Sequence, residues 1–181
     1  MSLLSYNRLV QLVEDGVITN VKPEQINSTS IDITLGDTVL YEDEPTEGEG
    51  NHYVSLKERR PLNVLEQVDG IFYLEPSQFI LAQSEQKFYL PNNISAEYKL
   101  KSSMARIGLE HLNAGWCDAG WNNSVLTLEL KNMTQYHTIM LEKGVAIGQM
   151  VFFEHEPVPH ERSYAARGRY NNDSTVSGVK K

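Results

Sequence analysis

Short runs rich in β-branched and aromatic residues follow one another from residue 70 to residue 157, with Pro, Gly and Asn between them. The runs at 78–91 (QFILAQSEQKFYLP), 124–132 (SVLTLELKN) and 147–157 (IGQMVFFEHEP) are typical of strands that end at turns. No second long helical pattern interrupts this succession. We therefore predict a mainly β fold, a barrel or jelly roll, in which residues 1–181 form a single domain.

The N-terminal part of the chain predicts one helix and two strands. Apolar residues recur near helical spacing within residues 3–15, and Gly16 is typical of a helix end. Residues 30–41 (SIDITLGDTVLY) alternate apolar and polar positions, which predicts a strand, a turn and a second strand. Residues 42–51 (EDEPTEGEGN) are acidic and contain Gly and Pro, so they are expected to form a solvated loop.

Composition excludes several classes of protein. A formal net charge of −8 argues against a nucleic-acid surface, which normally carries a basic footprint. The single cysteine, Cys117, excludes a disulfide framework and any zinc site built on two or more thiolates. No apolar run is long enough for a membrane span, and no basic flank followed by an apolar run marks a signal peptide, so we expect a cytoplasmic protein.

The charge is unevenly distributed along the chain. Residues 157–181 hold five basic side chains against two acidic ones, whereas the rest of the chain is strongly acidic. This segment is polar and nearly free of aliphatic residues. Its last twenty residues, 162–181, are therefore expected to form a disordered tail that cannot contribute to the core.

The first segment that could carry chemistry is residues 101–108 (KSSMARIG). Lys101 and Arg106 can bind phosphate oxygens by charge, and the hydroxyls of Ser102 and Ser103 add hydrogen-bond donors. A solvated turn is the alternative interpretation.

A second segment, residues 113–121 (NAGWCDAGW), combines glycines that permit close backbone approach with the flat faces of Trp116 and Trp121 around Asp118. A tight turn with two core tryptophans would have the same sequence.

A third segment, residues 124–132, predicts a strand that places its leucines on one face and Thr127, Glu129 and Lys131 on the other. If the second face lines a pocket, Glu129 is a candidate proton carrier; otherwise it is an exposed strand residue. The five histidines show no metal-ligand spacing and are interpreted as structural. The zinc-deaminase signature, the P-loop and the dinucleotide-binding fingerprint are all absent.

Five stretches share their order and spacing with one known family. They are residues 26–36 (INSTSIDITLG), 101–109 (KSSMARIGL), 114–121 (AGWCDAGW), 126–132 (LTLELKN) and 144–152 (GVAIGQMVF). Together they resemble the dCTP deaminases of the trimeric dUTPase-like superfamily. In the tail, residues 168–170 (GRY) are similar to the core of that family's closing segment.

The resemblance implies a dUTPase-like distorted β-barrel or jelly roll with a short N-terminal helix and a flexible C-terminal lid, here residues 157–181. It implies hydrolysis of dCTP to dUTP and ammonia without zinc. Glu129 would act as general acid and base, and Ser102 and Arg106 would fix the water and the glutamate.

The resemblance also implies how the substrate is bound. Lys101, Ser102 and Ser103 would hold phosphates, with Mg²⁺ bridging the triphosphate oxygens. Backbone groups around Ala114 would read the exocyclic amine, and Asp118 would lie against the deoxyribose. The remaining residues expected at the substrate are Arg106, Gly115, Trp116, Trp121, Arg169 and Tyr170. Family members are homotrimers with sites at subunit boundaries, so a homotrimer is expected.

Two departures from the family pattern matter. Asp173 stands where family tails usually carry a glutamine that touches the nucleotide, and a carboxylate near phosphates needs a compensating cation such as Arg169. The form of residues 114–116 (AGW) is similar to members that also cleave the triphosphate, releasing dUMP and pyrophosphate. Alternatives to the deaminase are a dUTPase that does not deaminate and a catalytically decayed nucleotide-binding protein.

Overall fold

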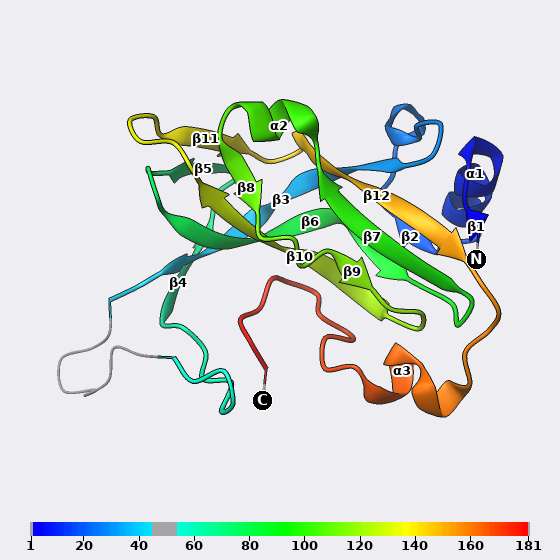
Figure 1. Cartoon of the computed structure of the whole chain (residues 1–181). Helices are drawn as coiled ribbons and strands as arrows, with labels where there is room; N and C mark the ends of the chain where they lie inside the picture. Colours follow the sequence, from blue (N-terminus) through cyan, green and yellow to red (C-terminus); the bar gives the residue numbers. More distant parts are fainter. Residues whose placement is uncertain (1, 45–53, 181) are drawn as a thin grey trace.

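A single strongly curled sheet forms the body of the protein in the computed structural model, which describes residues 2–44 and 54–180 (Figure 1). Its strands run in the order β8-β10-β6-β3-β12-β7-β9, and every pairing among them is antiparallel. Their bounds are β3 (Ile31–Glu42), β6 (Phe79–Tyr89), β7 (Ile94–Leu100), β8 (Leu109–His111), β9 (Trp116–Cys117), β10 (Asn122–Asn132) and β12 (Ala146–Glu154). The mainly β prediction is confirmed.

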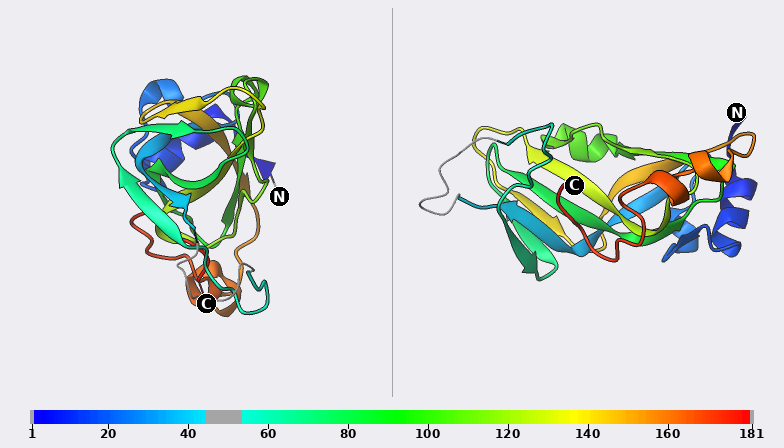
Figure 2. Two further views of the ribbon diagram at one scale, coloured as in Figure 1. Left: turned by 90° about the vertical axis from the view of Figure 1, so that its left-hand side faces the viewer. Right: turned by 90° about the horizontal axis from the view of Figure 1, so that it is seen from below.

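Shorter elements complete the fold. The strands β1 (Ser2–Leu3), β2 (Ile18–Thr19) and β4 (Val64–Val68) pair with β12, β6 and β3, while β5 (Ile71–Leu74) and β11 (Ile139–Glu142) form a separate ribbon. The helices are α1 (Tyr6–Glu14), α2 (Ser102–Arg106) and α3 (Tyr164–Arg167), with 3₁₀ turns η1 (Pro23–Gln25) and η2 (His160–Arg162). Seen end-on, the strands curve round a common interior (Figure 2). None of the helices in the described residues is long and apolar enough to cross a membrane.

The neighbouring strands β6 and β10 explain where the core and the cavity lie. Along both strands every second residue is buried, which places residues such as Phe88 and Leu128 in the core. The intervening residues of β10, Thr127 and Glu129, face the other way, as the alternation predicts. One face of this strand pair therefore builds the core and the other is free to line a binding site.

The N-terminal prediction holds for the helix and fails for the following strands. Leu9 and Leu12 of α1 are buried, and Gly16 ends the turn after it with φ +73°. Residues 31–42 form one continuous strand rather than two strands and a turn. Gly36 marks a close approach instead of a turn, since a Cβ there would lie 2.7 Å from Cγ of Gln83 on β6.

The C-terminal segment also departs from expectation. Val176 in this segment is 3 % exposed, and its backbone N–H donates a hydrogen bond to Oε1 of Gln83. This contact corrects the view that the tail cannot contribute to the core. Of the acidic segment at 42–51, residues 45–51 lie outside the described residues.

Replacing Phe88 with alanine should destabilise the protein by about 3–5 kcal/mol, because the side chain is fully buried and stacks on Trp121 with ring centroids 5.2 Å apart. Urea unfolding at a fixed protein concentration measures the free energy of unfolding. Tyr136→Ala is the control, since that side chain is 85 % exposed. Equal losses in the two variants would contradict this account of the core.

Candidate active site

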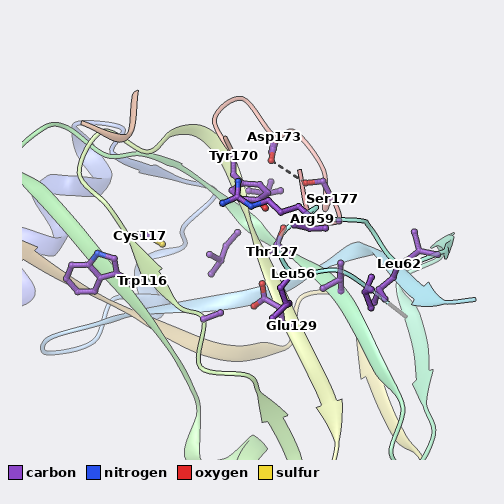
Figure 3. Close-up of a pocket in the computed structure, with 18 of the residues that line it drawn as sticks. Leu56, Arg59, Leu62, Trp116, Cys117, Thr127, Glu129, Tyr170, Asp173 and Ser177 are labelled. Carbon is purple, nitrogen blue, oxygen red and sulfur yellow. Dashed lines mark hydrogen bonds between the residues drawn. The ribbon is translucent and has the colours of Figure 1, made fainter. Parts of the chain in front are cut away.

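A cavity of about 600 Å³ opens between β10, the β9 loop and the C-terminal tail (Figure 3). Residues 54–64, before and at the start of β4, complete its wall. The sequence-predicted residues that line it are Ala114, Trp116, Asp118, Trp121, Glu129 and Tyr170. The chain therefore gathers the expected catalytic carboxylate and most of the expected base- and sugar-binding residues around one space.

Glu129 projects from β10 into this cavity (Figure 3). Its backbone is fixed by antiparallel pairing with β6, where it stands opposite Leu81. The side chain is 26 % exposed, and its Oε2 atom is buried without a hydrogen-bond partner among the described residues. A carboxylate that is held by a sheet and lines a cavity is suited to exchange protons with a water molecule bound there.

The loop before β10 supplies flat and polar groups to the same cavity. Trp116 donates a hydrogen bond from Nε1 to Oδ1 of Asp118 over 2.9 Å. Trp121 is 6 % exposed, but Trp116 is 54 % exposed, so the interpretation of both tryptophans as core residues is wrong for Trp116. Gly115 lies so close to β7 that a Cβ at this position would be 2.5 Å from the carbonyl oxygen of Tyr98, so only glycine fits there.

The tail is tied to the start of β10 at the rim of the cavity. The indole N–H of Trp121 donates to the carbonyl of Tyr170 over 2.9 Å, and Ser124 donates its hydroxyl to the same carbonyl. The N–H of Val125 donates to the carbonyl of Asp173. The tail thus lies across its own chain's cavity.

The carboxylate of Asp173 is compensated inside the tail. It pairs with Lys180 and accepts a hydrogen bond from Ser177, so Lys180 takes the role that the sequence suggested for Arg169. Arg169 instead lines an adjoining, more polar cavity of about 450 Å³ together with Arg162 and Arg167. The two cavities share Asp118, Tyr164 and Tyr170.

The segment expected to bind phosphate lies elsewhere. Residues 102–106 form α2, and Lys101, Ser102, Ser103 and Arg106 do not line the Glu129 cavity. Lys101 forms a two-oxygen ion pair with Asp32, at 2.7 and 2.8 Å, while Ser102 and Arg106 are exposed. A single chain therefore does not bring this segment to the predicted catalytic carboxylate.

The structure adds residues that sequence reasoning missed. Arg59 and Arg60 line the cavity from the segment before β4 and carry no motif that would have marked them. His111 on β8 lies beside Glu129, with 3.4 Å between Nε2 and Oε2. Sequence spacing could not find it, because His111 reaches Glu129 through strand pairing across eighteen positions of chain.

Cys117 lines the cavity but is a poor nucleophile. Burial, together with the nearby carboxylates of Asp118 and Glu129, raises the pKa of its thiol to about 12. The thiol therefore stays protonated at neutral pH, and the thiolate is the reactive form.

Comparisons with known proteins agree on one family. A family model described as dCTP deaminase-like matches residues 3–155. A protein of Aquifex aeolicus named "dCTP deaminase, dUMP-forming" is 34% identical over 177 residues, covering 96% of this chain and 92% of its own. A protein of Methanospirillum hungatei with the same name is 36% identical over 135 residues, covering 74% and 70%.

Solved structures support the fold. A 2'-deoxycytidine 5'-triphosphate deaminase from Agrobacterium tumefaciens superposes with a TM-score of 0.63 at 20% identity, over 83% of this chain and 47% of its own, so this chain spans about half of its length. A dUTPase from Streptococcus mutans gives a TM-score of 0.50 at 18% identity, over 76% of this chain and 87% of its own. The dUTPase-like architecture implied by the sequence is confirmed.

Proposed function

Because this chain belongs to the dCTP deaminase-like family, we propose that it deaminates dCTP and releases dUMP rather than dUTP as the final product. The observation that carries the proposal is Glu129, the matching carboxylate of the family motif, which projects into a cavity large enough for a nucleotide base and sugar. The dUMP-forming name of the relatives agrees with the Ala114-Gly115-Trp116 form of the loop.

In the proposed deamination Glu129 mediates both proton transfers, as general base and then as general acid. Its carboxylate accepts a proton from water, and the resulting hydroxide adds to C4 of cytosine while that proton passes to N3. A second proton, from the new hydroxyl, passes through Glu129 to the 4-amino group. The C4–N4 bond then breaks, a C4 carbonyl forms, and dCTP and water have become dUTP and ammonia, with no zinc in the reaction.

The loop before β10 would select the nucleotide. Backbone groups around Ala114 would read the amine, and Asp118, held by Trp116, would accept a hydrogen bond from the deoxyribose hydroxyl. A site that reads the base edge with buried polar groups discriminates strongly, because a wrong base leaves those groups unpaired. The second step would be attack of water on the α-phosphorus, with pyrophosphate as leaving group.

The phosphate-binding part of the site would come from a second copy of the chain. Ser102, Ser103 and Arg106 are exposed and lie off the Glu129 cavity, which supports an assembly that brings α2 of one subunit to the cavity of the next. We assign the assembly as a homotrimer, following the family resemblance. Mg²⁺ would arrive on the triphosphate, since Asp118 and Asp173 are already engaged by Trp116 and Lys180.

Incubation with dCTP and Mg²⁺, followed by chromatography and an ammonia assay, tests this function. Equal amounts of ammonia, dUMP and pyrophosphate are expected, also after treatment with a zinc chelator and restoration of Mg²⁺. Accumulated dUTP would restrict the enzyme to deamination. Cleavage of dUTP with no ammonia from dCTP would leave a dUTPase, and nucleotide binding without any product would leave a binding protein.

Removing residues 172–181 should impair turnover far more than folding. The loss takes away the segment across the cavity, so kcat/KM for dCTP is expected to fall by about tenfold or more. The melting temperature should fall by only about 5 °C, because Val176 is the single core side chain removed among the described residues of this segment. Steady-state kinetics and thermal unfolding measure the two effects. Unchanged kinetics would contradict a role for the tail as a lid.

A further inference from the structure

Unpaired polar atoms gather at one point of the interior. Among buried side-chain nitrogen and oxygen atoms of the described residues, three lack a hydrogen-bond partner: the hydroxyl of Tyr98, Nε2 of His111 and Oε2 of Glu129. A buried polar atom without a partner is costly, so such atoms call for an explanation in water, ligand or mechanism. All three lie around the carboxylate that the proposed function needs.

His111 is held directly beside Glu129 by the sheet. On β8 it stands opposite Leu130, the residue after Glu129 on β10. Its Nε2 lies 3.4 Å from Oε2 of Glu129, and its side chain is only 4 % exposed. A small movement of either side chain brings the two atoms to hydrogen-bonding distance.

The ring of Tyr98 packs against the imidazole of His111. The ring centroids of Tyr98 and His111 are 4.5 Å apart, with the planes tilted by 54°. The space for the tyrosine ring exists because residue 148 on β12 is glycine: a Cβ there would lie 2.1–2.2 Å from ring atoms and hydroxyl of Tyr98. Gly148 therefore fixes Tyr98, which packs on His111.

Two other titratable groups near Glu129, Tyr98 and Cys117, are neutral. Burial and the nearby Glu129 carboxylate raise the pKa of Tyr98, which keeps the phenol protonated. The Cys117 thiol of β9 is neutral for the reason given above. An imidazole with hydrogen on Nε2 is a donor that fits the unpaired carboxylate oxygen.

We propose that His111 is a positioning residue for Glu129, which donates a hydrogen bond from Nε2 to Oε2 and is held in place by Tyr98 over Gly148. This inference rests on the proposed function. The bond would fix one oxygen of the carboxylate and turn the other toward the water and the base. His111 itself would touch neither the substrate nor the reacting atoms.

The first test separates positioning from binding. His111→Leu should lower kcat for ammonia release by about 10- to 100-fold, with KM for dCTP within about threefold of wild type. His111→Gln, whose amide can donate to the same oxygen, should recover most of the loss. Gly148→Ala, which displaces Tyr98, should resemble His111→Leu, and exposed His137→Gln should match wild type. A parallel rise of KM, or failure of glutamine to restore kcat, would overturn the inference.

A second test does not depend on activity. NMR of the imidazole nitrogens in the wild-type protein should place the His111 proton on Nε2, and Glu129→Gln should shift that resonance. A proton on Nδ1, or a resonance indifferent to Glu129→Gln, would overturn the inference even in an active enzyme. Conversely, an Nε2 proton that responds to this substitution, in a protein that does not deaminate dCTP, would refute the proposed function alone.

Discussion

Glu129→Gln should reduce ammonia release from dCTP by about a thousandfold or more. The amide has the same shape as the carboxylate, so the cavity and the pairing of β10 with β6 stay in place. It cannot accept a proton from water at neutral pH, and the attack on C4 loses its base. A stopped or continuous ammonia assay at saturating dCTP measures the effect.

Glu110→Gln is the matched control for this substitution. Glu110 lies on the neighbouring strand β8 but is exposed and off the cavity, so its variant should keep full activity. Calorimetric titration should find dCTP binding to Glu129→Gln within a small factor of wild type, which locates the defect in chemistry. Undiminished ammonia release by Glu129→Gln would remove this residue from the mechanism.

Arg106→Ala and Glu129→Gln should each be inactive alone and regain activity when the two chains are assembled together. Arg106 is exposed on α2 and absent from the cavity that holds Glu129, so a functional site would combine Glu129 of one subunit with Arg106 of another. In a cyclic trimer that holds both kinds of chain, one of the three sites would combine two intact partners. The expected activity of the purified mixed assemblies is therefore about a third of wild type.

Co-expression with two affinity tags, followed by sequential purification, isolates the mixed assemblies for this measurement. A double variant carrying both substitutions on one chain, mixed with wild type, controls for exchange of subunits. Mixed assemblies without activity would place both residues in the same chain's site. Full activity of Arg106→Ala alone would exclude the arginine from catalysis.

Much of the fold was predictable because it depends on local patterns. The strict alternation of β10 sets the faces of Leu128 and Glu129, and Gly16 ends the first helix by a positive φ that glycine adopts freely. The continuity of β3 through Gly36 was not predictable from local pattern. Glycine is needed at this position because the side chain of Gln83, on a strand nearly fifty residues away, leaves no room for a Cβ. The neighbours of Gly36 in sequence do not show this.

In the candidate site, too, local patterns were predictable and contacts between distant segments were not. The residues of one strand and one loop, Glu129 and Asp118, were found from type and spacing and do line one cavity. Lys101 was expected at phosphate, yet a carboxylate from β3 holds it as an ion pair. The positions of His111 and Tyr98 near Glu129 result from strand pairing and ring packing. These contacts could not be predicted from the spacing of residues along the chain.

The contact between Trp121 and the tail gives the protein an optical reporter of its own. The chain has two tryptophans, and the structure separates them: Trp116 is half-exposed, whereas Trp121 is buried with its indole N–H bound to the carbonyl of Tyr170. Lifting of the tail, as the proposed lid requires, would break that hydrogen bond and expose the indole to water, so the emission of Trp121 would shift to longer wavelength. Stopped-flow fluorescence on the unlabelled protein would time the tail's movement against each chemical step, and a Trp116→Phe variant would separate the signal of Trp121 from that of Trp116, which also lines the cavity.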